Sequence, residues 1–229
     1  MSADWDPANI AGDDAVDLTV LLASEFERLE ADVLEHLKGS WCSEQKARLL
    51  LELVVLARPE VCVEIGAFSG STTLPILAGL RHVGRGRAYV VEAWSNEEAT
   101  RGLPGHDVNA KWWATVDMAA VRAQFDALIE GWSLGPWCDV LAEPSSQVAA
   151  RVPPIDLLHL DGSFAEEGAS QDSDNYLPKV VPGGHVVLSN ALVTVGGRPA
   201  KMRALWPLFD QCDILDEVDG GNTLLFRKR

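Results

Sequence analysis

The sequence has no long apolar run and few cysteines. No segment approaches the roughly 18 consecutive apolar residues that cross a membrane as a helix, and the opening residues Met-Ser-Ala-Asp-Trp-Asp lack the apolar core of a secretion signal. The four cysteines lie far apart, without a Cys-x-x-Cys pair or a histidine at ligand spacing. These absences predict a cytoplasmic protein without a membrane anchor, whose cysteines are buried thiols and not zinc ligands.

Positive charge is also scarce. The 19 Lys and Arg are outnumbered by 34 Asp and Glu, which gives a net charge of −15 at pH 7, and the basic residues are scattered. Such a surface repels phosphate backbones and anionic lipids, so we expect neither nucleic acid nor a membrane as a partner. With 229 residues, 47% of them apolar, the chain can build one substantial core. We expect an N-terminal arm and helix over residues 1–40 and a single domain over 41–229.

The spacing of apolar residues predicts alternating helices and strands. From 14 to 38 they recur at helical spacing up to Gly39, and Ser43 can cap a second helix over 44–57. The first helix could pair with a second subunit to form a homodimer or cover the sheet, and its pattern does not distinguish the two. Strands are predicted at 61–65, 87–92, 138–142, 155–160 and 184–189, alternating with helices near 71–80, 117–130, 146–150, 166–180 and 198–209. This alternation indicates an α/β fold with a doubly wound, mostly parallel sheet.

The end of the chain predicts a change of strand direction. Residues 213–218 and 222–227 have strand composition and flank Asp219-Gly220-Gly221, which suits a tight turn. The last strand should therefore run antiparallel to its neighbours. Dinucleotide-binding domains of the doubly wound class usually lack such a hairpin.

A glycine turn follows the first predicted strand. Glu64, Gly66 and Gly70 lie in the spacing Glu-x-Gly-x-x-x-Gly between the strand and a helix. Glycines at the carboxyl end of a strand let the backbone come close to a ligand. The spacing differs from the Gly-x-Gly-x-x-Gly motif of dinucleotide sites. A carboxylate here suits the cationic amine and sulfur of S-adenosylmethionine better than a pyrophosphate, so the turn favours that methyl donor over NAD.

Three sequence blocks occur in an order typical of one family. They are Val63-Glu64-Ile65-Gly66-Ala67-Phe68-Ser69-Gly70, Leu158-His159-Leu160-Asp161-Gly162-Ser163-Phe164 and Tyr176-Leu177-Pro178-Lys179-Val180-Val181-Pro182-Gly183-Gly184. On these blocks, residues from about 60 to 192 resemble class I S-adenosylmethionine-dependent methyltransferases, and within them the small-molecule O-methyltransferases similar to the macrocin and catechol enzymes. The resemblance implies a Rossmann-like fold whose mostly parallel, seven-stranded sheet has an antiparallel C-terminal strand.

The resemblance also assigns residues to the donor site. Glu64 and the backbone of the glycine turn would hold the amino-acid part of the donor, and Glu92 would accept hydrogen bonds from both ribose hydroxyls. The two residues after Glu92 would flank the adenine, whose edge Ser145 or Ser146 would reach, although a helix-capping role explains these serines nearly as well. The implied donor-binding residues are Glu64, Gly66, Ala67, Phe68, Ser69, Gly70, Ser71, Thr72, Glu92, Ala93, Trp94, Ser145, Ser146, Asp161 and Gly162.

Asp161 and His106 are the residues expected to act on the acceptor. Asp161 ends an apolar strand where the methyl group should sit, and His106 lies in a long loop, so both are candidate bases for a hydroxyl. His159 is interpreted as a core histidine. In metal-dependent relatives a magnesium or calcium ion orients the acceptor hydroxyl. Of the metal-binding positions only Asp161 and Asn190 keep ligand-type oxygens here, and a divalent cation such as Mg²⁺ would need water, Asp172 or the substrate to complete its shell.

Residues 93–137 form an unusually long connection. They include Trp112 and Trp113, which predict a lid or acceptor pocket, because indole faces suit sugars and flat rings, although packing alone explains these tryptophans equally well. Lys201, after a second glycine-rich loop, could meet a carboxylate of the acceptor, although its interpretation as a surface residue at a helix start is favoured.

Together these features predict transfer of a methyl group to a hydroxyl of a small molecule, such as a sugar, a natural product or an aromatic compound. Two other functions stay open. One is a NAD-dependent oxidoreductase or epimerase on a Rossmann sheet. The other is a catalytically degenerate protein that only binds the donor, because Ser163, Phe164 and Ser189 stand where relatives carry ligands.

Overall fold

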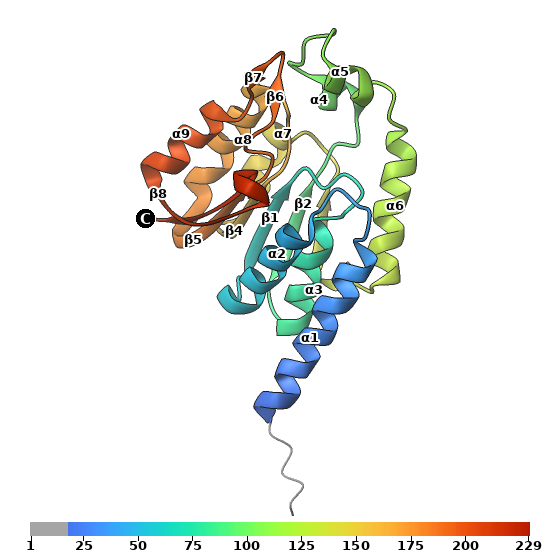
Figure 1. The fold of residues 1–229 in the computed structure, drawn as a ribbon, viewed down its shortest axis with the longest axis vertical. Helices are drawn as coiled ribbons and strands as arrows, with labels where there is room; N and C mark the ends of the chain where they lie inside the picture. The colour runs from blue at the N-terminus through green and yellow to red at the C-terminus, as the bar shows by residue number, and fades with distance from the viewer. Residues whose placement is uncertain (1–17) are drawn as a thin grey trace, which may run out of the picture.

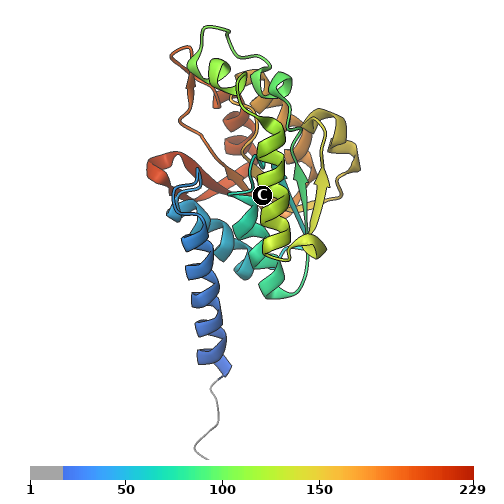
Figure 2. The ribbon, with the colours of Figure 1, turned by 90° about the vertical axis from the view of Figure 1, so that its right-hand side faces the viewer.

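The computed structural model describes the chain from Leu18 to the C-terminus, with side chains from Ala23 onward. The predicted arm, and the start of the helix expected from residue 14, lie outside the described residues. The helix itself is α1 (Leu18–His36), and Figures 1 and 2 show its N-terminal half extending away from the body of the protein. Near its other end, Val33 and Leu37 are buried in a core shared with α2 (Glu44–Ala57) and α3 (Thr73–Val83).

A seven-stranded sheet forms the centre of the fold, in the order β3-β2-β1-β4-β5-β9-β8. The strands are β1 (Val61–Ile65), β2 (Arg87–Val91), β3 (Cys138–Leu141), β4 (Ile155–Leu160), β5 (Val180–Leu188), β8 (Cys212–Val218) and β9 (Thr223–Lys228). The first five pair in parallel, whereas β9 runs antiparallel to both β5 and β8. The predicted sheet with its antiparallel C-terminal hairpin is therefore confirmed.

Helices cover both faces of the sheet (Figure 1). The remaining helices are α4 (Asn96–Thr100), α5 (Val108–Trp113), α6 (Met118–Gly131), α7 (Ser145–Val148), α8 (Glu166–Tyr176) and α9 (Met202–Gln211), with short 3-10 turns at Gly135–Trp137, Ala149–Arg151, Leu177–Lys179 and Asp219–Gly221. Cys62 of β1 belongs to the core under α2, α3 and α6, and Val63 and Ile65 to the core under α8 and α9. Because both faces are buried, a parallel strand is apolar along its whole length. None of the helices in the described chain is long and apolar enough to span a membrane.

Two short segments lie over the carboxyl ends of the parallel strands. One consists of α4 and α5, and the other is the hairpin of β6 (Thr194–Val195) and β7 (Arg198–Pro199), which lies beside them (Figures 1 and 2). The hairpin delays the helix expected from residue 198, which begins at Met202. The Asp107 carboxylate joins the two segments, because it accepts hydrogen bonds from the backbone N–H of Gly196 (3.0 Å) and of Asn109 (2.8 Å). These two bonds lower the pKa of Asp107.

Candidate active site

A cavity of about 1000 Å³ opens at the carboxyl ends of β1, β2 and β4. In a doubly wound sheet this edge is where ligands bind, at the point where the strand order reverses on either side of β1. Twelve of the predicted site residues line the cavity: Gly66, Ala67, Phe68, Ser71, Thr72, Glu92, Ala93, Ser145, Ser146, Asp161, Gly162 and Asn190. Residues more than 100 positions apart in the sequence, such as Gly66 and Asn190, are thus gathered around one space.

The glycine turn after β1 permits a close approach of two backbones. Gly66 has a φ of 90°, in the region that favours glycine, and a Cβ atom there would lie 2.6 Å from the backbone oxygen of Asp161. Gly70 has a φ of 92°, and its Cβ would lie 2.6 Å from Leu128 of α6. Gly66 therefore brings the turns after β1 and β4 together at the floor of the cavity.

Glu92 follows β2 and borders the cavity. Its carboxylate accepts hydrogen bonds from the backbone N–H groups of Phe68 (3.1 Å) and Trp94 (2.9 Å), so it holds the glycine turn against the end of β2. Burial raises the pKa of Glu92, and the backbone donors partly oppose this. Trp94 does not line the cavity. Its indole N–H donates to the Phe68 carbonyl (2.9 Å), and its ring packs against Arg122, whose guanidinium lies 4.2 Å from the ring centre.

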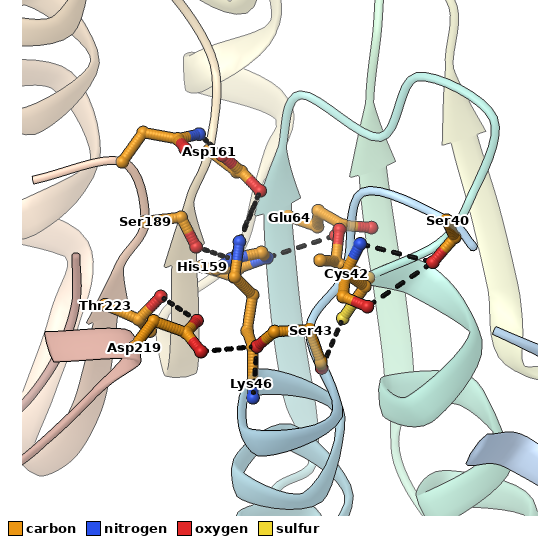
Figure 3. Close-up of polar contacts among 12 residues, drawn as sticks. Ser40, Cys42, Ser43, Lys46, Glu64, His159, Asp161, Ser189, Asp219 and Thr223 are labelled. Atoms are coloured by element: carbon orange, nitrogen blue, oxygen red, sulfur yellow. Dashed lines mark hydrogen bonds and ion pairs between the residues drawn. The ribbon is translucent and has the colours of Figure 1, made fainter. Parts of the chain in front are cut away.

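Glu64 lies below the cavity and does not line it. Its side chain is 1% exposed, and its carboxylate accepts hydrogen bonds from the hydroxyls of Thr72 (2.6 Å) and Thr73. Its third partner is His159, whose Nδ1 lies 3.1 Å away and whose Nε2 lies 2.9 Å from the Ser189 hydroxyl (Figure 3). The structure does not place Glu64 on the cavity surface, where a direct contact with the donor is expected of it, because its carboxylate is enclosed within the protein. Glu64 instead fixes the start of α3 through the hydroxyls of Thr72 and Thr73.

Asp161 lies at the floor of the cavity, at the end of β4. One carboxylate oxygen accepts a hydrogen bond from the Asn190 side-chain amide (2.5 Å), and the other lies 3.8 Å from Lys46 Nζ and 3.8 Å from His159 Nε2. Lys46 is 4% exposed and lines the cavity. It lies in α2, away from any strand end, so no sequence pattern marked it as a site residue. Lys201 is 2% exposed, so its interpretation as a surface residue is wrong. Burial lowers the pKa of Lys201, although Asp161 and a second acid, Asp172, favour its charged form.

The predicted metal pair is brought together but does not fit a divalent cation. Asn190 turns its amide nitrogen toward Asp161, as it must when the two side chains contact each other directly. An ammonium group, Lys46, already faces Asp161. Among residues 18–229, no group of three or more His, Cys, Asp or Glu side chains could hold a metal ion. The small number of candidate ligands and the positive charge of Lys46 are therefore both unfavourable for Mg²⁺.

Ser145 and Asp172 share a hydrogen bond beside the predicted adenine edge. The Ser145 hydroxyl donates to the Asp172 carboxylate (2.5 Å), and the Tyr176 hydroxyl donates to the Ser145 backbone oxygen (2.7 Å). Burial raises the pKa of Asp172. Of these two serines, Ser145 is thus engaged within the protein, and Ser146, which also lines the cavity, is the one left to contact a ligand.

Aromatic side chains form one wall of the cavity. They are Trp41, Phe68, Trp112, Trp113 and Phe164. The rings of Trp41 and Phe68 are stacked with a centroid separation of 5.0 Å and an interplanar angle of 4°, and Trp113 meets Phe68 edge to face at 5.5 Å. Trp112 and Trp113 thus border the cavity as the long connection predicted, whereas Trp41 had no sequence signal. Trp41 also contacts Trp112, with ring centroids 4.9 Å apart, and remains 59% exposed.

His106, Ser69 and Gly70 do not line the cavity. His106 lies in the segment before α5 and is exposed to solvent. The structure therefore does not bring this histidine to Asp161.

The fold and this cavity define a class I S-adenosylmethionine-dependent methyltransferase. A family model described as a methyltransferase domain matches residues 63–191, which is more than half of the chain. The chain therefore belongs to this methyltransferase family. No curated protein matches its sequence.

Solved structures with the same fold include three O-methyltransferases. TomG from Streptomyces achromogenes, in complex with SAM, has 13% sequence identity and a TM-score of 0.61, with 88% of this chain and 90% of that chain covered. The O-methyltransferase from Bacillus cereus, in complex with SAH, has 16% identity and a TM-score of 0.57, with 94% of each chain covered. NovP has 17% identity and a TM-score of 0.61, with 93% of this chain and 99% of that chain covered. At these identities the likeness shows a shared fold.

Proposed function

We propose that this protein transfers the methyl group of S-adenosylmethionine to a hydroxyl of a small molecule. The observation that carries the proposal is that Glu92, the Gly66 turn and Asp161 border one cavity at the strand ends. TomG and the Bacillus cereus enzyme, which share the fold, were solved with SAM and SAH, and this supports the donor assignment. When bound, S-adenosylmethionine supplies a methyl group on a positively charged sulfur.

The donor would occupy the part of the cavity between the ends of β1 and β2. Glu92 would accept hydrogen bonds from the ribose hydroxyls, and the close-packed Gly66 turn leaves its backbone accessible to the amino-acid part. Ala93 and Ser146 border the cavity where the adenine is expected. Ser69, Gly70 and Trp94, which do not line the cavity, would support this site from behind.

Asp161 is the proposed proton acceptor. The acceptor O–H would pass its proton to the Asp161 carboxylate while the oxygen forms a bond to the methyl carbon. The electron pair of the broken C–S bond stays on sulfur, which becomes neutral. The step therefore needs alignment, exclusion of water and one base, and no covalent intermediate on the protein.

The aromatic wall favours an acceptor with a flat or apolar face. Trp41, Phe68 and Trp113 line the same cavity as Asp161, and ring contacts of the kind they can make favour aromatic rings and the apolar faces of sugars. We favour an aromatic hydroxyl compound within the predicted classes. A cytoplasmic location and a homodimer stay predictions, and light scattering would test the latter.

Calorimetry with S-adenosylhomocysteine, followed by a tritiated-methyl assay on a panel of phenols, catechols and glycosides, tests the proposal. We expect binding with a stoichiometry of about one and transfer to at least one hydroxyl compound. Absence of binding, together with binding of NADH, would contradict it and favour the oxidoreductase. Binding without transfer to any acceptor would favour the degenerate alternative.

A further inference from the structure

Lys46 is a buried cation whose charge is incompletely paired. It lies in the first turn of α2, where the Ser43 hydroxyl accepts a hydrogen bond from its backbone N–H (3.0 Å). Its side chain runs from α2 to the end of β4, beside the ring of His159 (Figure 3). Asp161, its ion-pair partner, lies 3.8 Å from Nζ, which is longer than a hydrogen bond. Burying an ammonium group is unfavourable unless its donors find acceptors.

The unused donors of Lys46 face the cavity. Lys46 is one of its lining residues, and Nζ has no hydrogen-bond acceptor among the residues that the structure describes. Asn190 donates a hydrogen bond to Oδ1 of Asp161, the carboxylate oxygen that does not face Lys46. An oxygen atom of a ligand placed next to Asp161 would therefore meet both a carboxylate and an ammonium donor.

A divalent cation at this position would meet like charge. Lys46 lies on one side of Asp161, and the buried Lys201 interacts electrostatically with the same carboxylate. Lys46 and Lys201, which lie beside Asp161 and Asp172, supply positive charge of the kind that such an ion would bring. Asp161 and Asn190 thus fit Mg²⁺ poorly, and the Lys46 ammonium of the protein itself supplies a positive charge at this position.

We infer that the Lys46 ammonium binds the acceptor oxygen, so that methyl transfer at this site needs no divalent cation. This inference rests on the proposed methyltransferase function. The ammonium donates a hydrogen bond to the oxygen while Asp161 removes its proton, and it stabilises the negative charge that develops before the oxygen bonds to the methyl carbon. Lys46 keeps its own proton throughout. The atoms and charges therefore balance as before: the acceptor proton goes to Asp161, the methyl group goes to the acceptor oxygen, and the electron pair stays on sulfur.

A Mn²⁺ titration followed by electron paramagnetic resonance, on protein saturated with S-adenosylhomocysteine, tests the absence of a metal site without any acceptor. We expect free Mn²⁺ only, at millimolar metal. Bound Mn²⁺ that disappears in Asp161→Asn would overturn the inference. Failure of S-adenosylhomocysteine to bind would instead contradict the proposed function, and the calorimetric titration that precedes the metal experiment detects it.

Two substitutions test the role of Lys46 itself. Lys46→Met keeps the length of the side chain without its charge, and should lower the rate of transfer in EDTA by at least about 100-fold, as does loss of a donor to a developing oxyanion. Lys46→Arg should restore part of the rate. Lys38 is an exposed surface lysine, and Lys38→Met, the control, should leave the rate unchanged. Thermal unfolding with S-adenosylhomocysteine checks that each variant is folded.

Three results would contradict the role of Lys46. The first is a Lys46→Met variant as fast as the wild type. The second is loss of wild-type activity in EDTA with recovery on adding Mg²⁺. The third is a Lys46→Met variant whose main defect is weaker binding of S-adenosylhomocysteine, which would assign the ammonium to the donor carboxylate.

Discussion

His159 Nδ1 lies 3.1 Å from the carboxylate of Glu64, and both side chains are excluded from solvent. The pair joins β4 to β1 directly below the cavity, and the second ring nitrogen of His159 continues the connection to Ser189 after β5. Three strand ends are thus fixed relative to one another by one imidazole. A buried network of this kind is stabilising only while every member has a partner.

His159→Leu should therefore destabilise the protein by about 1–3 kcal/mol, because Glu64 and Ser189 each lose a buried partner. Urea denaturation measures the difference. His106→Ala, at the exposed histidine, should change stability by less than about 0.5 kcal/mol and should leave methyl transfer intact. A large loss of activity in His106→Ala, with normal stability, would restore this residue as a base and contradict the assignment to Asp161.

Glu92 should make donor binding depend on pH. Burial raises its pKa from the usual 4.5, and only the ionised carboxylate can accept hydrogen bonds from both ribose hydroxyls and the backbone. As the pH falls through this raised pKa, S-adenosylhomocysteine should bind more weakly, and the decline should begin at a higher pH than for an ordinary glutamate. Calorimetry over a pH series measures it.

The matched variants for this effect are Glu92→Gln and Glu97→Gln. Glu92→Gln should weaken binding at neutral pH by about 10-fold or more, since a charged hydrogen-bond acceptor is lost, and should flatten the pH dependence. Glu97 is exposed on α4 and serves as the control. An unchanged pH profile in Glu92→Gln would show that another group titrates.

That Gly66, Glu92 and Asp161 border one cavity could be predicted from the sequence for a physical reason. Strand ends of a parallel sheet meet at one edge, so Gly66, Glu92 and Asp161, each just after an apolar strand, had to lie near one another. The signal for the hairpin at Asp219 was equally local. Its turn residues have positive φ, 57° for Asp219 and 64° for Gly220, and the residue types Asp and Gly indicate this directly. Such signals lie within a few residues of the feature that they predict.

The acceptor half could not be predicted in the same way. Lys46 and Trp41 come from the segment before the first strand, and they reach the cavity only because α2 packs beside β1 and β4. Lys201 follows a glycine-rich loop, a context typical of exposed residues, and tertiary packing buries it. Glu64 has the right position in the motif, but its orientation depends on His159, 95 residues further along the chain.

Asp161 and Glu92 should differ in which kinetic step they affect. Asp161→Asn keeps the shape of the side chain but removes the proton acceptor, so transfer should fall by about 100-fold to 10,000-fold while S-adenosylhomocysteine affinity changes little. Single-turnover rates and calorimetry separate the two effects. Equal losses of donor affinity in Asp161→Ala and Glu92→Ala would contradict this division of roles.

Trp41 should contribute to acceptor binding and not to donor binding. Its ring is stacked on Phe68 in the cavity wall and is 59% exposed, so Trp41→Ala should raise KM for phenolic acceptors by about 2- to 10-fold, the contribution of one aromatic contact. Trp41→Phe should retain most of the effect. Trp206, which is 64% exposed on α9 and outside the cavity lining, provides a control of similar size. Equal effects of Trp41→Ala on acceptors with and without a ring would argue against stacking.

Gly66 should tolerate no side chain. In Gly66→Ala the new Cβ would lie 2.6 Å from the Asp161 backbone oxygen and 2.7 Å from Gly162 Cα, at a φ of 90° that alanine rarely adopts. Backbone strain and overpacking together predict a loss of about 2–4 kcal/mol in the free energy of unfolding, which urea denaturation measures. Gly131→Ala, where the added Cβ meets nothing within 4 Å, is the matched control and should be neutral or slightly stabilising. The contact at Gly66 joins the turn after β1 to the turn that holds Asp161, so any folded Gly66→Ala protein should lose donor affinity and transfer together. A variant that lost only stability would contradict this, because it would show that the two turns can separate without harm to the site.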